Sequence, residues 1–219
     1  MSAVLFFAAS LAAAGVSAST DDAGNQPHSL SLSHRNFTLD YGSGRVDTKV
    51  ADITLIFDGH HGERWRSNIF GGLSYLTQTD NPSTGGLYAS GIHAGASADV
   101  YLVKSTHFDV FLHTALLFRE LDPDDGRQRV TIETTELDAR VGASTTLGNV
   151  RAYAGRRYGR IEGEQRVSGT TNETRDFHET RRTGNFAGLE LPVQGRNYVG
   201  VMAESGVDRN IAVYYGRMF

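Results

Sequence analysis

Apolar and polar residues alternate along most of the chain after residue 29. The clearest stretch places Ile92, Ala94, Ala96, Ala98 and Val100 on one side of an extended backbone. His93, Gly95, Ser97, Asp99 and Tyr101 fall on the other side. Because successive side chains of a strand point to opposite faces, this period of two predicts a β-strand with one apolar and one polar face.

The same alternation, interrupted by clusters of polar turn residues, predicts ten strands. They cover about residues 30–40, 46–57, 65–77, 87–103, 108–120, 136–144, 150–157, 186–191, 199–204 and 209–219. The first hairpin has the weakest pattern, and without it the count falls to eight. After Ala18 no apolar run is long enough for a membrane helix, and backbone in lipid satisfies its hydrogen bonds only in helices or closed barrels. The pattern therefore predicts an all-β fold, a transmembrane antiparallel up-and-down β-barrel of ten strands, alternatively eight.

The connections between these strands differ in length with their position. With a periplasmic amino terminus, the third, fifth and seventh connections lie outside, and they are long and polar: 78–86, 121–126 and 162–175. The fourth, sixth and eighth lie inside and are short. Outer-membrane barrels have short periplasmic turns and longer external loops. The first and ninth connections break the rule, but a soluble β-sandwich, the alternative fold, gives no reason for the alternation.

The last predicted strand is amphipathic and ends on an aromatic residue. Ile211, Val213, Tyr215 and Phe219 share one face, with Arg217 between them. This strand resembles the last strand of small Gram-negative outer-membrane β-barrel proteins of the OmpA, OmpX and OmpW type. The resemblance implies that it pairs with the first strand and that those four residues form a signal read by the barrel-assembly machinery. The family usually carries an aromatic residue where Arg217 stands.

The amino terminus predicts export. Residues 1–18 form an apolar run that ends in small residues, with Val16-Ser17-Ala18 as a plausible cleavage site. The run is short and rich in Ala for a membrane anchor, and it lacks the usual basic residue near Met1. We expect a signal peptide over residues 1–18, a periplasmic segment over 19–29 and a barrel over 30–219.

Composition excludes several classes of function. The chain has no cysteine, which excludes disulfides, Cys–zinc sites and thiol catalysis. Its net charge is −4, so no basic excess favours nucleic acid. Of 21 basic residues only Lys49 and Lys104 are lysine. Arginine pairs bidentately with carboxylates, which fits a packed polar interior, although a GC-rich genome would give the same bias. No cofactor or metal site is predicted.

The polar faces of the predicted strands carry both signs of charge. The residues expected to face the lumen are Asp99, Asp109, His113, Arg119, Glu136, Asp138, Arg140, Arg151, Arg157, Glu190 and Glu204, with Tyr101, Tyr153 and Tyr214. Barrels of this size have narrow interiors that side chains largely fill. Because buried charges are costly unless they are paired, we expect a salt-bridge plug, with a narrow polar pore as the alternative.

Two kinds of catalytic barrel can be tested against the sequence. Lipid A deacylases carry a His-x-Ser pair on one strand face, and this chain has none. Omptin-type proteases use an Asp-x-His facing an Asp pair across the rim. Asp176 and His178 form an Asp-x-His, in which the carboxylate could make the imidazole a base for water. The facing pair is missing, so the motif is more simply part of a solvated loop.

Together these features predict a non-enzymatic integral outer-membrane barrel, structural or narrow pore-forming. An omptin-like hydrolase that uses Asp176 and His178 is the alternative. The expected partners are outer-membrane lipid, lipopolysaccharide and the barrel-assembly machinery, with no nucleic acid, and the expected state is a monomer in the bacterial outer membrane.

Overall fold

The computed structural model describes residues 29–61, 64–81, 83–123, 129–169, 172–180, 182–193, 197–205 and 209–217. The regular structure in these ranges is entirely β, and none of them contains a helix that could cross a membrane. The strands are β1 (Ser29–Asp40), β2 (Arg45–His61), β3 (Trp65–Asn81), β4 (Gly85–Lys104), β5 (Phe108–Pro123), β6 (Arg129–Leu147), β7 (Val150–Ser168), β8 (Glu173–Glu179), β9 (Thr183–Pro192), β10 (Asn197–Ser205) and β11 (Arg209–Arg217). The predicted signal peptide, residues 1–18, lies outside the described residues.

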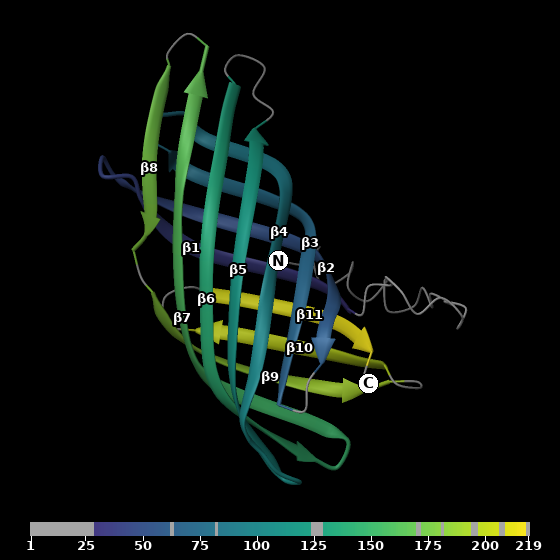
Figure 1. The fold of residues 1–219 in the computed structure, drawn as a ribbon. Helices are drawn as coiled ribbons and strands as arrows, with labels where there is room; N and C mark the ends of the chain where they lie inside the picture. The colour runs from purple at the N-terminus through teal and green to yellow at the C-terminus, as the bar shows by residue number, and fades with distance from the viewer. Residues whose placement is uncertain are drawn as a thin grey trace, which may run out of the picture.

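The strands form one closed antiparallel barrel (Figure 1). Neighbours in sequence are neighbours in the sheet from β1 to β7 and from β9 to β11, and β11 pairs with β1 over residues 29–36. Both β8 and β9 pair with β7, β8 with its residues 162–167 and β9 with residues 151–158. β8 and β9 therefore occupy the same position in the barrel wall, one above the other, and count as one strand. The barrel has ten strands, which confirms the predicted fold class.

The pairing register fixes how steeply the strands lean. Starting at Leu32 and stepping across β2 to β6 leads to Glu164 on β7. Stepping the other way, across β11, β10 and β9, leads to Ala152 on the same strand, twelve residues lower. With a rise of about 3.3 Å per residue and a strand spacing of about 4.8 Å, this stagger gives a tilt of about 40° to the barrel axis.

The wall has ten strands at one end and eight at the other. β10 and β11 have 9 residues each, whereas β6 and β7 have 19. Above the β10–β11 hairpin, β8 leans across to β1, where His178 and Glu179 pair with Asp40 and Leu39. In Figure 1, β8 stands at the upper left beside the long strands, while β9, β10 and β11 lie lower. We call the eight-stranded end the outer section (described residues among 37–50, 76–90, 120–135 and 159–179) and the remainder the belt section.

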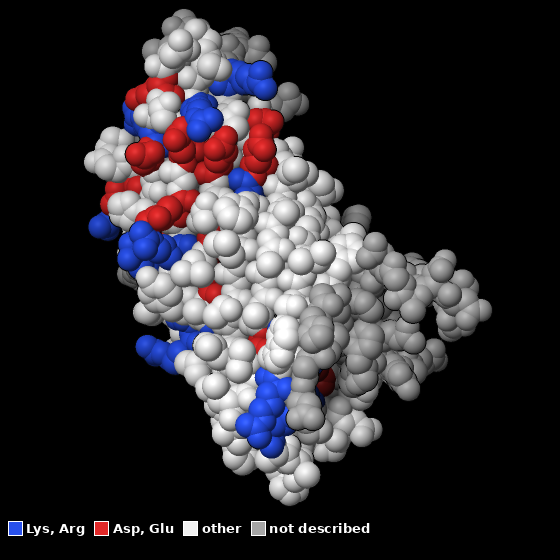
Figure 2. All heavy atoms as spheres, in the orientation of Figure 1, with Lys and Arg blue, Asp and Glu red and all other residues white. Residues whose placement is uncertain are grey.

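Large apolar side chains cover the outside of the belt section. Nearly every strand contributes exposed examples: Ile53, Leu55, Trp65, Ile69, Leu73, Ile92, Val100, Leu112, Leu116, Phe118, Leu137, Val141, Leu189, Leu191, Val201, Ile211 and Tyr215. On β5 this face runs from Phe108 to Phe118, a rise of about 25 Å at the calculated tilt. Figure 2 shows the charged residues crowded over the upper part of one face and sparse over its middle.

The prediction of long polar external loops is wrong. Residues 162–168 and 173–175 belong to β7 and β8, residues 78–81 and 85–86 to β3 and β4, and residues 121–123 to β5. Their outward side chains are polar, and for this reason the sequence pattern predicts loops there. Their inward side chains, such as Leu121, Val167 and Phe177, are apolar and buried, so the strands continue beyond the belt section.

Candidate functional site: the closed lumen

Glu136 is the centre of an ion-pair cluster that fills the belt section. It projects inward from β6 and is 6% exposed. Arg35 reaches it from β1 with both guanidinium ends, and its Nη2 donates to Glu136 Oε2 at 2.7 Å. Arg157 from β7 donates to Glu136 Oε1 at 3.3 Å, and Arg119 from β5 lies 3.9 Å from Oε2. The carboxylate of Glu136 thus links its own strand, β6, to the arginines of three other strands across the lumen.

A second carboxylate extends this cluster toward β10 and β11. Asp138 accepts a hydrogen bond from Arg157, and its other oxygen forms an ion pair with Arg140 Nε at 2.8 Å. Arg140 Nη2 also lies 2.9 Å from Glu204 Oε1, and Asn210 donates to the other oxygen of Glu204 at 3.0 Å. These contacts tie both short strands to the middle of the barrel.

On the opposite side the cluster continues through Arg119 to Asp52, Ser74 and His93. Arg119 donates to Asp52 Oδ2 at 3.0 Å and to Ser74 Oγ at 2.9 Å. Ser74 donates to Asp52 Oδ1 at 2.6 Å, so its oxygen accepts from His93 Nδ1 at 2.9 Å. The proton of Ser74 therefore points at the carboxylate and not at the histidine. This trio is a structural network and lacks the arrangement of a serine hydrolase, in which histidine takes the serine proton.

The ion pairs of this cluster join equal numbers of arginines and carboxylates. Four arginines (Arg35, Arg119, Arg140 and Arg157) meet four carboxylates (Asp52, Glu136, Asp138 and Glu204). Buried charge is tolerated when it is paired and hydrogen-bonded. The arrangement holds strands together across the lumen and leaves its centre occupied by side chains.

Below the cluster the lumen holds smaller polar groups. Arg151 donates to Glu190 Oε2 at 3.2 Å, and Tyr214 donates to Glu190 Oε1 at 2.9 Å. The hydroxyls of Tyr153 and Tyr214 are 2.8 Å apart. His113 and Asp99 form a separate pair at 2.9 Å, and Asp109 accepts from Ser144. These side chains are partly exposed, which places them near the inner mouth.

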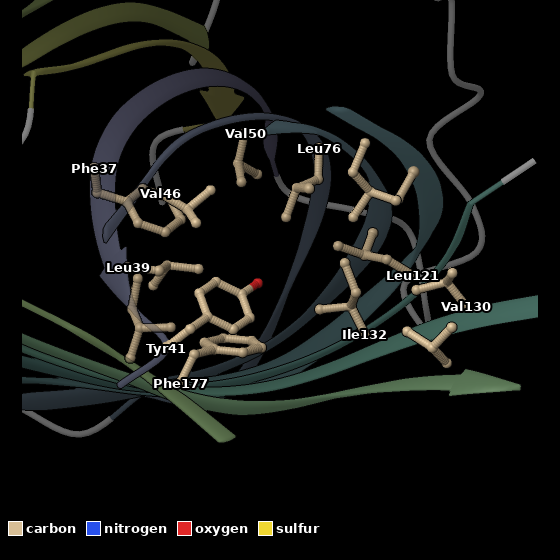
Figure 3. Packing of buried hydrophobic residues seen from close by; sticks show 14 residues of the cluster. Phe37, Leu39, Tyr41, Val46, Val50, Leu76, Leu121, Val130, Ile132 and Phe177 are labelled. Carbon is tan, nitrogen blue, oxygen red and sulfur yellow. The ribbon is translucent and has the colours of Figure 1, made fainter. Parts of the chain in front are cut away.

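The outer section has the opposite sidedness, with an apolar interior. Its buried cluster consists of Phe37, Leu39, Tyr41, Val46, Val50, Leu76, Leu87, Ala89, Leu121, Val130, Ile132, Ile161, Val167 and Phe177. Figure 3 shows these side chains pointing into the ring of strands. Tyr41 and Phe177 bring their ring centroids to 5.0 Å from opposite sides of the β1–β8 seam. The outer end of the lumen is therefore sealed by a hydrophobic core.

A neutral hydrogen-bond network lies within this core. Gln78 donates to the hydroxyls of Tyr41 and Thr48, and Asn81 donates to Gln78 at 2.6 Å and to Gln165 at 3.0 Å. Gln78 and Gln165 are fully buried. Burial raises the pKa of Tyr41 to about 12, so its phenol stays protonated at neutral pH. Satisfied polar groups of this kind fix the relative positions of the strands.

The structure places every residue of the predicted polar lumen inside the barrel, and it adds partners to that set. Arg35, Asp52, Thr54, Ser74, His93 and Asn210 belong to the same network but were not predicted as its members. His93 was expected on the inward face of its strand without a role. The apolar core of the outer section was also not predicted.

The predicted catalytic alternative lies on the outer wall. Asp176 and His178 are both exposed on β8 and face away from the lumen. Asp176 is paired in register with Glu164, and His178 with Glu162 on one side and Asp40 on the other. The motif therefore has acidic neighbours, but they lie along one wall and not across a rim. Among the described residues no group of His, Asp and Glu has the geometry of a metal site.

The predicted assembly signal is only partly described. Ile211 and Tyr215 are exposed on the outside of β11, and Val213 lies between them, in register with Leu32 of β1. The expected pairing of the last strand with the first is present. Phe219 lies outside the described residues.

Comparisons with known proteins give weak likenesses. No family model matches the chain, and a search of curated proteins gave no match. Similar solved structures include the transport unit of the autotransporter AIDA-I from Escherichia coli, with TM-score 0.49, 10% identity and 97% of each chain covered. The translocator domain of the autotransporter NalP from Neisseria meningitidis has TM-score 0.46, 10% identity and 90% coverage of each chain. Neisserial surface protein A has TM-score 0.45 and 15% identity over 86% of this chain and 96% of its own. The fold assignment rests on strand pairing and not on these likenesses.

Proposed function

We propose that this chain is an integral outer-membrane β-barrel protein with a closed lumen and a structural, non-enzymatic role. The observation that carries the proposal is the reversal of sidedness between the two sections. The belt section is apolar outside and charged inside, as a wall in lipid requires. The outer section is charged outside and apolar inside, as a wall in water requires. The apolar height of about 25 Å fits the band expected of outer-membrane barrels.

The ion-pair cluster of the belt section and the apolar core of the outer section both support a plugged lumen in preference to a pore. An ion moving through the barrel would have to pass the paired charges around Glu136 and then the apolar core around Leu121 and Ile132. An apolar constriction opposes ion passage by itself because it excludes water.

Planar-bilayer recording tests this part of the proposal. The full chain, reconstituted from detergent, is expected to insert without producing steady conductance steps. Insertion is checked independently by co-migration with vesicles on flotation. If the inserted protein is folded and still gives reproducible single-channel steps, the lumen conducts ions and the plug is overturned.

A surface hydrolase remains a second candidate because of one observation: His178 lies between Asp40 and Glu162 in register, two residues from Asp176. Replacing His178 by alanine is expected to leave hydrolysis of peptides by outer-membrane preparations unchanged, because a general base needs a bound substrate and the motif faces open solvent. Glu164→Gln serves as the matched control on the same wall. A selective loss of peptide hydrolysis in the His178 variant would favour the hydrolase.

A further inference from the structure

The apolar belt is interrupted on the outside of β7 and β9. Arg156 on β7 is exposed, and its register neighbours are Val141 on β6 and Asn185 on β9. Its Nη1 donates to Asn185 Oδ1 at 2.9 Å. Residues on either side of it along β7 are Ala154 and Tyr158, which face the same way. Arg156 thus stands among residues that otherwise face hydrocarbon.

Register and tilt place Arg156 below the upper edge of the belt. Its level on the barrel axis is about 9 Å below that of Phe118 on β5, from the strand rise, spacing and stagger. Long arginine side chains can extend toward the membrane surface, but they need a polar partner there. Within the described ranges Arg156 forms no ion pair, and its one hydrogen-bond partner is the neutral Asn185.

Two further arginines lie about 10 Å above Arg156 along the barrel axis, and the break between β8 and β9 positions one of them, Arg182. Arg160, four residues further along β7, is exposed and paired with Glu162. Arg182 lies across from Gly159, whose N–H donates to the Arg182 carbonyl at 2.7 Å. Both Arg182 and Thr183 are exposed, although neighbours on a regular strand would alternate. The irregularity turns the side chain of Arg182 out of the wall, as bulges do next to sites.

We propose that Arg156, Arg160 and Arg182 bind the phosphate groups of a lipid in the outer leaflet. The inference rests on the proposed membrane placement of the belt section. Guanidinium groups bind phosphate oxygens bidentately, and among the described residues only Arg160 of these three arginines pairs with a carboxylate, that of Glu162. Because Arg156 lies below the upper edge of the belt, its guanidinium meets a lipid phosphate by extending toward the membrane surface, where acyl chains hold the ligand in place.

The surface below the arginines suits acyl chains. Ala143, Ala154, Ala187 and Ala203 lie opposite one another across β6, β7, β9 and β10. Their side chains are smaller than those of neighbours such as Val141 and Leu189. Small residues alone would not identify a ligand, but an apolar surface beneath a group of arginines fits the chains of a phosphorylated lipid.

Native mass spectrometry of the full chain released from nanodiscs tests the site. The probes are bis-phosphorylated lipid A, the same lipid without phosphates, and inorganic phosphate alone. Wild-type protein is expected to retain only the phosphorylated lipid. The double variant Arg156→Leu/Arg182→Leu is expected to retain it at least tenfold less, and Arg156→Lys/Arg182→Lys is expected to recover part of the loss. Arg45→Leu, which removes an exposed arginine from β2, three strand positions from β7, serves as the control.

Three outcomes would overturn the site. They are equal retention by the double Leu variant, an equal loss in Arg45→Leu, and equal retention of the lipid without phosphates. Binding of inorganic phosphate alone would assign a soluble-anion site and would also contradict the proposal. Failure of the wild-type chain to enter nanodiscs would instead show that the proposed membrane placement is wrong, so the two failures are distinguishable.

Discussion

Replacing Glu136 by alanine is expected to lower the free energy of unfolding by about 3–5 kcal/mol, the usual cost of breaking a buried ion pair. The substitution removes the carboxylate that Arg35, Arg119 and Arg157 share and leaves their charges facing one another. Water reaches this cluster poorly because Glu136 and Arg119 are almost fully buried. The measurement is the urea midpoint of the chain folded into lipid vesicles, followed by its heat-modifiable migration on a gel.

The matched control is Glu164→Gln on the outer wall. Glu164 also pairs with an arginine, Arg166, but this pair is exposed, and exposed pairs contribute about 0–1 kcal/mol. Its midpoint is expected to stay near that of wild type. Equal small shifts for both variants would mean that the lumen is wet and that its charges are screened, which would remove the basis for the plug.

Replacing Leu121 by aspartate is expected to open the outer section and to leave the belt section folded. Leu121 is fully buried in the apolar core, where even truncation to alanine costs about 2–5 kcal/mol and an unpaired charge costs more. The outer section has an apolar core of its own, distinct from the ion-pair cluster of the belt section, so we expect it to unfold locally. The readout is tryptic cleavage at exposed arginines such as Arg129 and Arg166, together with retained heat-modifiable migration.

Thr135→Asp is the control for this prediction. It introduces the same charge one strand away on the outward face, where water solvates it. Its cleavage pattern is expected to match wild type. Resistance of the Leu121 variant to trypsin would contradict a closed hydrophobic core in the outer section.

The sequence predicts the belt section well because its pattern is local. Alternation around Ile92 and Ala96 identifies strands and faces without knowledge of their partners. The final strand was expected to pair with the first, and β11 does pair with β1. Closure follows because a two-faced sheet in lipid cannot leave an edge unpaired.

The outer section was missed although its signal is also present in the sequence. On β1 the apolar positions change from Leu30 and Leu32 to Phe37 and Leu39, so the apolar residues move from one face to the other. On β2 the same change separates Val46 and Val50 from Ile53 and Leu55. A strand that crosses from lipid into water must reverse its sidedness in this way. A single phase for each strand does not allow for this reversal, and it predicts loops at 78–86, 121–126 and 162–175, where strands continue.

Partners in the lumen could not be predicted from sequence. Arg35 and Glu136 are 101 residues apart, and only the stagger of the closed barrel brings them to one level. Inward residues of both charges predict that ion pairs form in the lumen. Which arginine meets which carboxylate depends on the strand register. The break between β8 and β9, which positions Arg182, likewise results from fitting ten strands below to eight above.

The placement of the belt section in lipid is tested most directly by the fluorescence of Trp65. It is the chain's single tryptophan, and it is 45% exposed on the outside of β3 near the inner end of the belt. With the native chain in vesicles, brominated acyl chains are expected to quench its emission, while aqueous iodide is expected to leave it nearly unchanged. Strong quenching by iodide with no effect of brominated lipid would show that the apolar belt faces water or protein instead of a bilayer.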